Sequence, residues 1–301
     1  MHRFELGDSF EKIKSIADNS IDMCLTDPPY FLDALGDDWD ADAIEKRTLG
    51  STGVVGSLPS GMKFDKAQGY EFEKFMRRIS KEVFRVLKPG GFFVSCSAAR
   101  LYHRMAVAIE DEGFDIRDML GWTYQGQTKA FSMDHFIKKN TNLSEIEKQS
   151  LIEKLSGWKT PQLMPCIEPM TLAQKPTEGT FIQNWEKWGV GLLNSTAKFN
   201  NKFPGNIIPI PKPTKQEKGK FNTHVSVKPV ELFTHLMTLL TQEGALILDP
   251  FLGSGTTLVA AERTHRFCIG FEISEKYFAI IKRRYELEKN LIEGSELFQF
   301  T

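Results

Sequence analysis

The 301-residue sequence lacks the features that mark several classes of protein. It has only four cysteines, with no C-x-x-C pair and no histidine at ligand spacing, which argues against a zinc site or a disulfide framework. No apolar run approaches the roughly 18 residues of a membrane span. The start, MHRFELGDSF, lacks the apolar core of a signal peptide. We therefore expect buried, reduced thiols, no metal and a cytoplasmic location.

An excess of charge of either sign is also missing. The formal net charge is -1, so any contact with nucleic acid must come from a local basic patch. Apolar residues make up 41% and charged residues 26% of the chain, as in ordinary soluble globular proteins. We find no internal repeat. The length permits one large α/β domain or two small ones.

The first third of the chain alternates strand-like and helix-like segments. Short apolar runs predict strands at 3–6 and 21–26. Residues 70–87 carry apolar side chains at helical spacing. The KPGG sequence at 88–91 is expected to end that helix, and FFVSCS at 92–97 to form the next strand. Such alternation predicts a mainly parallel sheet.

The last third returns to the same alternation. It predicts a helix at 228–240, a strand at 245–250 and a helix at 256–264. A strand at 266–273 and a helix at 275–287 follow.

The middle of the chain has weak periodicity. One helix is predicted at 144–155, where Ser144 and Glu147 have capping-box spacing. Segment 198–228 is rich in lysine and has one acid, so it is either a solvated loop or a surface that contacts phosphate. The DNA-binding candidates in it are Lys198, Lys202, Lys212, Lys215, Lys218 and Lys220.

The stretch DPPY directly follows the strand predicted at 21–26. It places the carboxylate of Asp27, two prolines, Pro28 and Pro29, and the ring of Tyr30 side by side. Proline removes backbone donors and fixes φ, so this turn is stiff and rich in hydrogen-bond acceptors. A rigid surface turn without a function could have the same sequence. The stretch alone is therefore compatible with a functional site and with a structural turn.

A second motif, DPFLGSGTT at 249–257, joins a strand to a helix through a Gly-x-Gly turn. Glycines allow a tight turn and a close approach of backbone to a ligand. No lysine follows, so this is not the phosphate-binding loop of nucleotide hydrolases. Leu258 replaces the third glycine of the dinucleotide fingerprint. Glu272, at the end of the next strand, can accept ribose hydroxyls, which favours an adenosine-containing ligand.

Together these motifs resemble the S-adenosylmethionine-dependent amino-group DNA methyltransferases. The order, with DPPY before the cofactor motif, is similar to that of the beta group. The resemblance implies a Rossmann-like α/β fold with a mostly parallel seven-stranded sheet and a circularly permuted motif order. It also implies a catalytic half at 1–124, a variable target-recognition region at 125–222 and a cofactor-binding half at 223–301.

The resemblance also assigns roles to residues. It makes Asp27, Pro28, Pro29 and Tyr30 the catalytic group. THVSVKPVELF at 223–233 is similar to a family segment that holds the methionine end of the cofactor, with Ser226 where threonine is more usual. The implied binding residues for S-adenosyl-L-methionine are Asp8, His224, Ser226, Lys228, Asp249, Phe251, Gly253, Ser254, Gly255, Thr256, Thr257 and Glu272.

Aspartate at position 27 goes, in the family, with adenine methylated at N6, whereas serine goes with cytosine methylated at N4. We therefore expect an enzyme that flips adenine out of duplex DNA and methylates it. The alternatives are cytosine N4, RNA, a protein amide, or a binding module without turnover. Expected partners are double-stranded DNA, a second copy in a homodimer and a cognate restriction endonuclease, in the nucleoid of a prokaryotic or phage host cell, with no membrane.

Two further features remain without a firm assignment. The acidic run 33–45 would repel phosphate and is interpreted as a solvated loop, or as a loop that reshapes on DNA with Phe31 or Trp39 entering the duplex. The stretch 50–61 extends it. The other tryptophans, at 122, 158, 185 and 188, are predicted to lie in the core.

Overall fold

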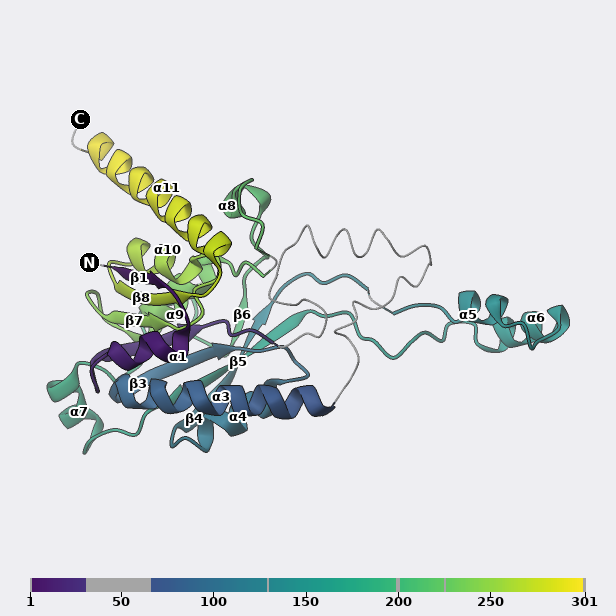
Figure 1. Cartoon of the computed structure of the whole chain (residues 1–301), viewed down its shortest axis with the longest axis horizontal. Helices are drawn as coiled ribbons and strands as arrows, with labels where there is room; N and C mark the ends of the chain where they lie inside the picture. Colours follow the sequence, from purple (N-terminus) through teal and green to yellow (C-terminus); the bar gives the residue numbers. More distant parts are fainter. Residues whose placement is uncertain (1, 31–65, 129, 199–200, 225, 300–301) are drawn as a thin grey trace.

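The computed structural model describes residues 2–30, 66–128, 130–198, 201–224 and 226–299. In these residues one eight-stranded sheet runs in the order β1-β8-β7-β2-β3-β5-β4-β6 (Figure 1). The strands are β1 (Arg3–Leu6), β2 (Ile21–Thr26), β3 (Leu87–Cys96), β4 (Asp115–Thr123), β5 (Ile167–Gln174), β6 (Ile207–Pro209), β7 (Leu246–Asp249) and β8 (Phe267–Glu272).

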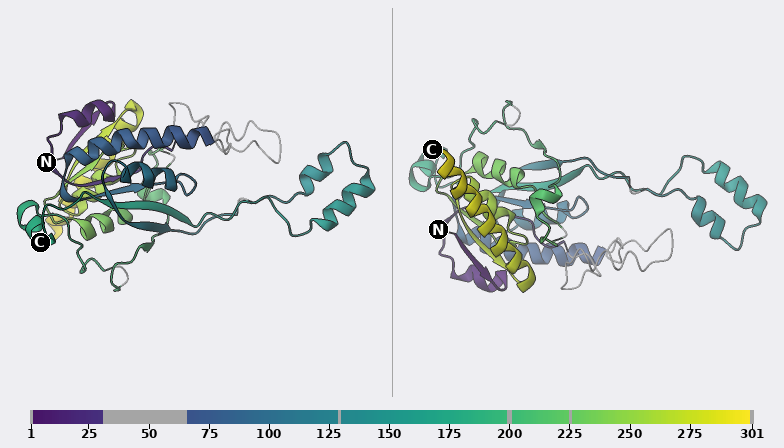
Figure 2. Two further views of the ribbon diagram at one scale, coloured as in Figure 1. Left: turned by 90° about the horizontal axis from the view of Figure 1, so that it is seen from below. Right: turned by 90° about the horizontal axis from the view of Figure 1, so that it is seen from above.

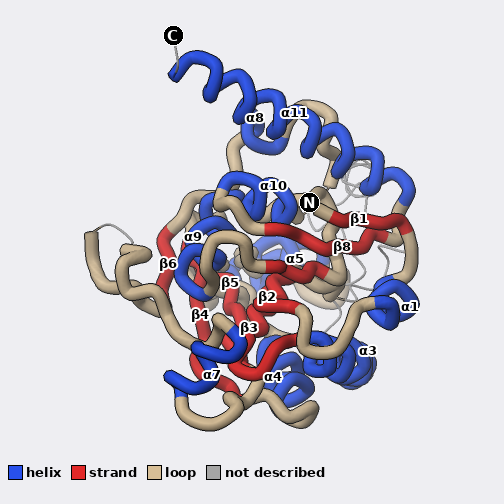
Figure 3. The backbone as a smooth tube through the Cα atoms, turned by 90° about the vertical axis from the view of Figure 1, so that its left-hand side faces the viewer, coloured by secondary structure: helices blue, strands red, loops and turns tan. Residues whose placement is uncertain are grey.

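Helices cover both faces of the sheet, as Figure 3 shows end-on. One face carries α1 (Ser9–Lys12), the 3-10 turn η1 (Ile13–Ser15), α3 (Lys66–Val86) and α4 (Tyr102–Glu110). The other carries α9 (Val230–Leu240), α10 (Thr256–Arg263) and α11 (Glu275–Gln299). The remaining helices are α5 (Asp134–Lys139), α6 (Glu145–Lys154), α7 (Phe181–Trp188) and α8 (Lys215–Lys218).

The alternation of side chains along β2 shows how the sequence builds these two layers. Met23 and Leu25 pack in the core beneath α9 and α10, whereas Cys24 packs in the core beneath α3 and α4. Successive side chains of a strand point to opposite faces, so a strand covered on both sides must be apolar throughout. All six residues of β2 are buried, which fits its central place in the sheet.

The predicted fold class is confirmed, with two corrections. The sheet has eight strands rather than seven, because the short β6 adds to β4 in parallel. The KPGG sequence lies inside β3 rather than before it. There the pairing of β2 with β3 shifts between Ile21 and Met23, and the left-handed Gly90 (φ +81°) lets the extra residues fit into the strand.

Strands β7 and β2 are parallel neighbours at the point where the chain order reverses. From β2 the chain continues through α3 to β3 on one side, and from β7 it continues through α10 to β8 on the other. In open α/β sheets, ligands bind outside the carboxyl ends of strands at such a switch point. Asp27 follows β2 and Asp249 ends β7, so the two motifs meet there.

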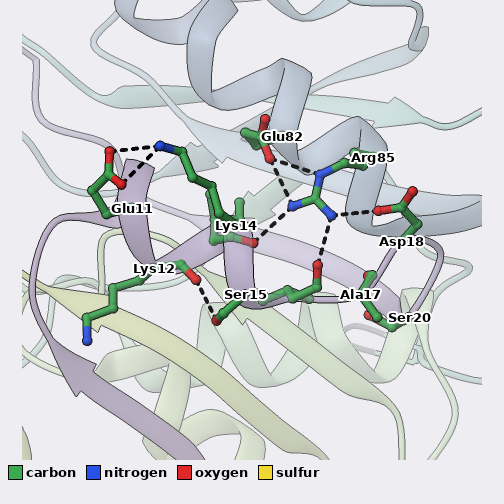
Figure 4. Close-up of polar contacts among 11 residues, drawn as sticks. Glu11, Lys12, Lys14, Ser15, Ala17, Asp18, Ser20, Glu82 and Arg85 are labelled. Atoms are coloured by element: carbon green, nitrogen blue, oxygen red, sulfur yellow. Dashed lines mark hydrogen bonds and ion pairs between the residues drawn. The ribbon is translucent and has the colours of Figure 1, made fainter.

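Arginine 85, near the end of α3, ties down the chain that leads into β2 (Figure 4). Its guanidinium donates to the carbonyl oxygens of Ile13 (3.0 Å) and Ile16 (2.8 Å) and to carboxylates of Asp18 (2.6 Å) and Glu82 (2.9 Å). These bonds fix the amino end of the strand whose other end carries Asp27.

The segment between β4 and β5 forms an arm that extends far from the sheet, with α5 and α6 at its tip (Figures 1 and 2). Its two sides pair at the Ser132–Lys159 bridge. Helix α6 begins at the predicted capping box of Ser144 and Glu147. Trp158 lies on this arm and is 72% exposed, so its predicted place in the core is wrong, because no sheet layer reaches it. Trp122 is buried as predicted.

Candidate active site

A cleft lies over the carboxyl ends of β2 and β7. It encloses about 320 Å³, open solvent at its mouth included, which is near the lower limit of ligand pockets, roughly 300–1,000 Å³. It is lined by Asp27, His224, Ser226, Lys228, Phe233, Asp249, Phe251, Leu252, Gly253, Ser254, Thr256 and Thr257. Residues of both sequence motifs and of the 223–233 segment therefore share one surface.

The carboxylate of Asp249 organises the turn that follows β7. It accepts hydrogen bonds from the hydroxyl of Thr26 (2.6 Å), the backbone N–H of Phe251 (3.0 Å) and the hydroxyl of Thr257. Asp249 has no cationic partner among the described residues. Burial raises its pKa to about 6 although the three hydrogen bonds oppose this. An anion without a counter-charge thus faces the cleft.

Glycines 253 and 255 are needed for the shape of this loop. Gly253 has φ +54°, and a Cβ there would lie 3.1 Å from Nε2 of His224. Gly255 has φ +81° and precedes the first turn of α10. The ring of His224 accepts from the backbone N–H of Ser226 (3.2 Å), and burial lowers its pKa to about 4. The imidazole beside the loop is therefore neutral at physiological pH.

Glu272, at the end of β8, supports the loop from behind. Its carboxylate accepts from the backbone N–H groups of Gly253 (2.8 Å) and Ser274 (2.8 Å), and burial raises its pKa to about 7. Asp8 lies at the end of the adjacent β1, exposed, where it caps α1 by accepting from Phe10 N–H (2.8 Å). Neither residue lines the cleft, although both lie at the same edge of the sheet.

Lys228 links the predicted catalytic motif to the rest of the cleft. Its buried ammonium lies 2.5 Å from Oδ2 of Asp27, 2.8 Å from Oε1 of Glu168 and 3.2 Å from the hydroxyl of Ser226. Burial acts to lower the pKa of Lys228, but the two carboxylates outweigh it and hold the pKa above its ordinary value. All three ammonium hydrogens are thus engaged by the protein.

Glu168, at the start of β5, is a site residue that the sequence analysis missed. Burial raises its pKa above the ordinary range, against the opposing effect of Lys228. Atoms of Asp27, Cys96 and Glu168 lie within 4.8 Å of one another, as in some metal sites. The Lys228 ammonium already contacts both carboxylates of this cluster and takes the place of a cation. No spacing in the sequence connects these segments, so only the fold reveals them.

The rest of the DPPY motif lies against the same cluster. Pro28 is buried and Pro29 half-buried. The hydroxyl of Tyr30 donates to Oδ1 of Asp27, and its ring packs edge-on against Phe72. Burial raises the pKa of Tyr30 well above its ordinary value, and the charges of Asp27 and Glu168 add to this effect.

The lysines predicted to contact DNA are not in the cleft. Lys198, Lys202, Lys212, Lys215 and Lys220 are exposed and Lys218 is half-buried. The Lys212 ammonium lies 4.1 Å above the ring of Tyr124, just after β4. The acidic run 33–45 and the stretch 50–61 lie outside the described residues, as do Phe31 and Trp39.

An open, mostly parallel sheet with a glycine-rich loop at its switch point defines the Rossmann-like class of ligand-binding proteins. The particular family follows from comparison with known sequences. Residues 21–283 match the model of the DNA methylase family that is named for N6 and N4 methyltransferases. The chain belongs to this family, which confirms the predicted class of amino-group DNA methyltransferase.

Individual relatives agree with the family match. The type II methyltransferase M.HindIII of Haemophilus influenzae is 31% identical over 94% of this chain and 95% of its own length. The type II methyltransferase M2.DpnII of Streptococcus pneumoniae is 28% identical over 94% of this chain and 88% of its own. The similarity thus spans both predicted halves and the middle region.

Solved structures show the same fold. The PvuII DNA methyltransferase, described as cytosine-N4-specific, aligns with a TM-score of 0.62 at 20% identity, over 94% of this chain and 85% of its own. M1.HpyAVI, solved with S-adenosylmethionine, aligns with a TM-score of 0.54 at 18% identity, over 95% of this chain and all of its own. In the described residues no helix is long and apolar enough to cross a membrane.

Proposed function

We propose that this chain transfers a methyl group from S-adenosyl-L-methionine to the N6 amine of adenine in duplex DNA. The observation that carries the proposal is the common cleft of Asp27 and the glycine-rich loop at 249–257. One motif supplies acceptors for an amine and the other supplies a cradle for a cofactor. A donor and an acceptor of the methyl group can therefore be held side by side.

The residues of the cleft fit S-adenosyl-L-methionine. The uncompensated carboxylate of Asp249 suits a ligand that carries a sulfonium and an ammonium group. Glu272 does not line the cleft, but it lies at the same edge of the sheet, and its carboxylate has more acceptor positions than the two backbone donors occupy, which leaves one for a ribose hydroxyl. When bound, the cofactor supplies an electrophilic methyl group and keeps the electron pair of the broken carbon–sulfur bond.

Asp27 and the carbonyl of Pro28 act on the substrate amine. The lone pair of an aromatic amine is delocalised into the ring, so the amine is a poor nucleophile. Two acceptors on its hydrogens make the nitrogen more nearly tetrahedral and direct the lone pair at the methyl group. As the nitrogen–carbon bond forms, the amine gives one proton to the carboxylate of Asp27, which passes it to solvent. Holding both reactants in this geometry supplies on the order of 7–11 kcal/mol in favourable cases.

The reaction requires the base to leave the duplex. Extrusion costs a few kcal/mol. Stacking on an aromatic ring returns about 1–3 kcal/mol, and Tyr30 is the aromatic residue of the motif. Its hydroxyl bond to Asp27 holds the ring beside the proposed amine acceptor.

Cytosine N4 is the second candidate. The fold does not discriminate between adenine and cytosine as the target base, because the PvuII enzyme with the same fold is described as specific for cytosine N4. Asp27 favours adenine, since the family pattern places aspartate there in adenine enzymes and serine in cytosine enzymes.

The test uses the full chain with labelled S-adenosylmethionine and plasmid DNA, followed by nucleoside analysis. We expect N6-methyladenine as the labelled base, and N4-methylcytosine would refute the adenine assignment. Asp27→Asn should lower transfer by about 10²-fold or more while cofactor affinity is kept. Glu110→Gln, an exposed change on α4, is the matched control and should keep full activity.

Contacts with DNA and with other proteins are part of this proposal. The exposed lysines between 198 and 220 would neutralise phosphates, so replacing one with glutamine should weaken binding to all sequences alike. The relatives are named type II methyltransferases, which supports a cognate restriction endonuclease as partner. Gel filtration of the chain tests the proposed homodimer.

A further inference from the structure

Both oxygens of Asp27 are occupied in the structure. Oδ1 accepts the hydroxyl of Tyr30. Oδ2 accepts the ammonium of Lys228 at 2.5 Å and faces the hydroxyl of Ser226 at 3.3 Å. A carboxylate that is to accept an amine hydrogen from a substrate must first release one of these partners.

Glu168 stands next to one of these partners, the Tyr30 hydroxyl. Its Oε1 is 3.5 Å from the Tyr30 hydroxyl, beyond the roughly 2.5–3.0 Å of an ordinary O–H···O bond. A movement of less than about 1 Å would close that gap. The Lys228 ammonium lies 2.8 Å from the same oxygen, so Glu168 is held facing the cluster.

The geometry points to Glu168 as a positioning residue that receives the Tyr30 hydroxyl when a substrate amine enters, which frees Oδ1 of Asp27. This inference rests on the proposed function and adds a residue to it. Glu168 acts through Tyr30 and Asp27 and does not touch the reacting atoms.

A carboxylate suits this task for two reasons. The hydroxyl moves from one anionic acceptor to another, so it exchanges one charge-assisted bond for an equivalent one. Without such an acceptor the part-buried hydroxyl would lose its partner in the protein, which is unfavourable. Lys228 meanwhile keeps its bonds to both carboxylates and holds them in place during the exchange.

Replacement of Glu168 and of the Tyr30 hydroxyl tests the exchange in four proteins: the wild type, Glu168→Gln, Tyr30→Phe and the double variant. Glu168→Gln keeps the shape but removes the charge, and it should lower the single-turnover rate of methyl transfer about 10-fold. Tyr30→Phe sets its own baseline rate, and because it has no hydroxyl to relocate, Glu168→Gln should cause little further slowing in that background. The double variant should therefore have the rate of Tyr30→Phe alone, because the exchange is no longer needed.

Equal slowing by Glu168→Gln in both backgrounds would overturn the inference, because Glu168 would then act without Tyr30. An unchanged rate in Glu168→Gln would overturn it as well. A wild type that methylates no DNA would instead refute the proposed function. A readout without cofactor or DNA is the ultraviolet titration of tyrosine. With the charge of Glu168 removed, the transition that Tyr30→Phe deletes should move to lower pH.

Discussion

The uncompensated carboxylate of Asp249 gives a quantitative prediction about stability. Its oxygens accept from Thr26, Phe251 and Thr257, and no cation neutralises it within the described residues. Asparagine fits the same contacts. The amide oxygen can accept from Thr26 and Phe251, and the amide nitrogen can donate to the hydroxyl of Thr257, which rotates to accept. Asp249→Asn therefore removes the charge with little change in shape.

The magnitude follows from the pKa of Asp249, which burial raises from 3.8 to about 6. Below pH 3.8 the folded and unfolded states both carry the proton, and burial of the group has no ionic penalty. As pH rises through 3.8 towards 6, the unfolded state loses its proton first and the folded state is destabilised. A difference of about 2 pKa units corresponds to a loss of roughly 3 kcal/mol in the free energy of unfolding, and this loss is complete above pH 6. Asparagine does not titrate, so it adds no such pH dependence to the free energy of unfolding.

The assay is denaturant unfolding of the cofactor-free wild type and of Asp249→Asn between pH 4 and 7.5. The free energy of unfolding of the variant, relative to the wild type, should rise by about 2–3 kcal/mol over this range. Ser95→Ala removes a buried hydroxyl that does not titrate, so its difference from the wild type should stay constant. A difference between Asp249→Asn and the wild type that is flat with pH would refute the reasoning.

Three further predictions follow from single contacts. Gly253→Val should abolish binding of S-adenosylmethionine in calorimetry, because the left-handed backbone and the ring of His224 leave no room for a side chain; normal binding would show that the cleft is misplaced. Arg85→Met should lower the free energy of unfolding by about 1–3 kcal/mol, since two backbone carbonyls lose their donor; an unchanged value would contradict this. The pKa of Glu272 is about 7, above that of Asp249 at about 6, so cofactor affinity should rise more between pH 7 and 8 in the wild type than in Glu272→Gln, and equal rises would contradict this.

The parts of the fold that the sequence predicted are those with local signals. The apolar run of β2, the Gly-x-Gly turn after β7 and the capping box at Ser144 each depend on a few neighbouring residues. Their bounds agree with the structure to within a few residues. The juxtaposition of Asp27 with Asp249 agrees with the fold that the family resemblance implied, in which both motifs follow strands beside the switch point.

The parts that were missed depend on contacts between distant segments. KPGG has the composition of a helix stop, yet Leu87 before it and Phe92 after it both pair with β2, which keeps it within β3. Glu168 follows Ile167 in an apolar strand and gives no sign in sequence that Lys228 will reach it. Trp158 has the large apolar side chain typical of a core residue, but its position on the arm leaves it exposed.

The charges of the site divide into two groups with different consequences. Asp27 and Glu168 share the ammonium of Lys228, so the proposed amine-binding end already has its counter-charge. Within the part of the chain that the structure describes, Asp249 and Glu272 have only neutral donors, and both have pKa values raised by burial. A cationic ligand at this second end recovers the stability that the ionised carboxylates cost, whereas a neutral ligand recovers none of it. The product of methyl transfer has lost the sulfonium charge, so under the proposed function these carboxylates should hold the product less tightly than the cofactor. Asp249→Asn should accordingly reduce the preference of the cleft for S-adenosylmethionine over S-adenosylhomocysteine, measured as the ratio of the two dissociation constants, and an unchanged ratio would show that the charge is not what distinguishes them.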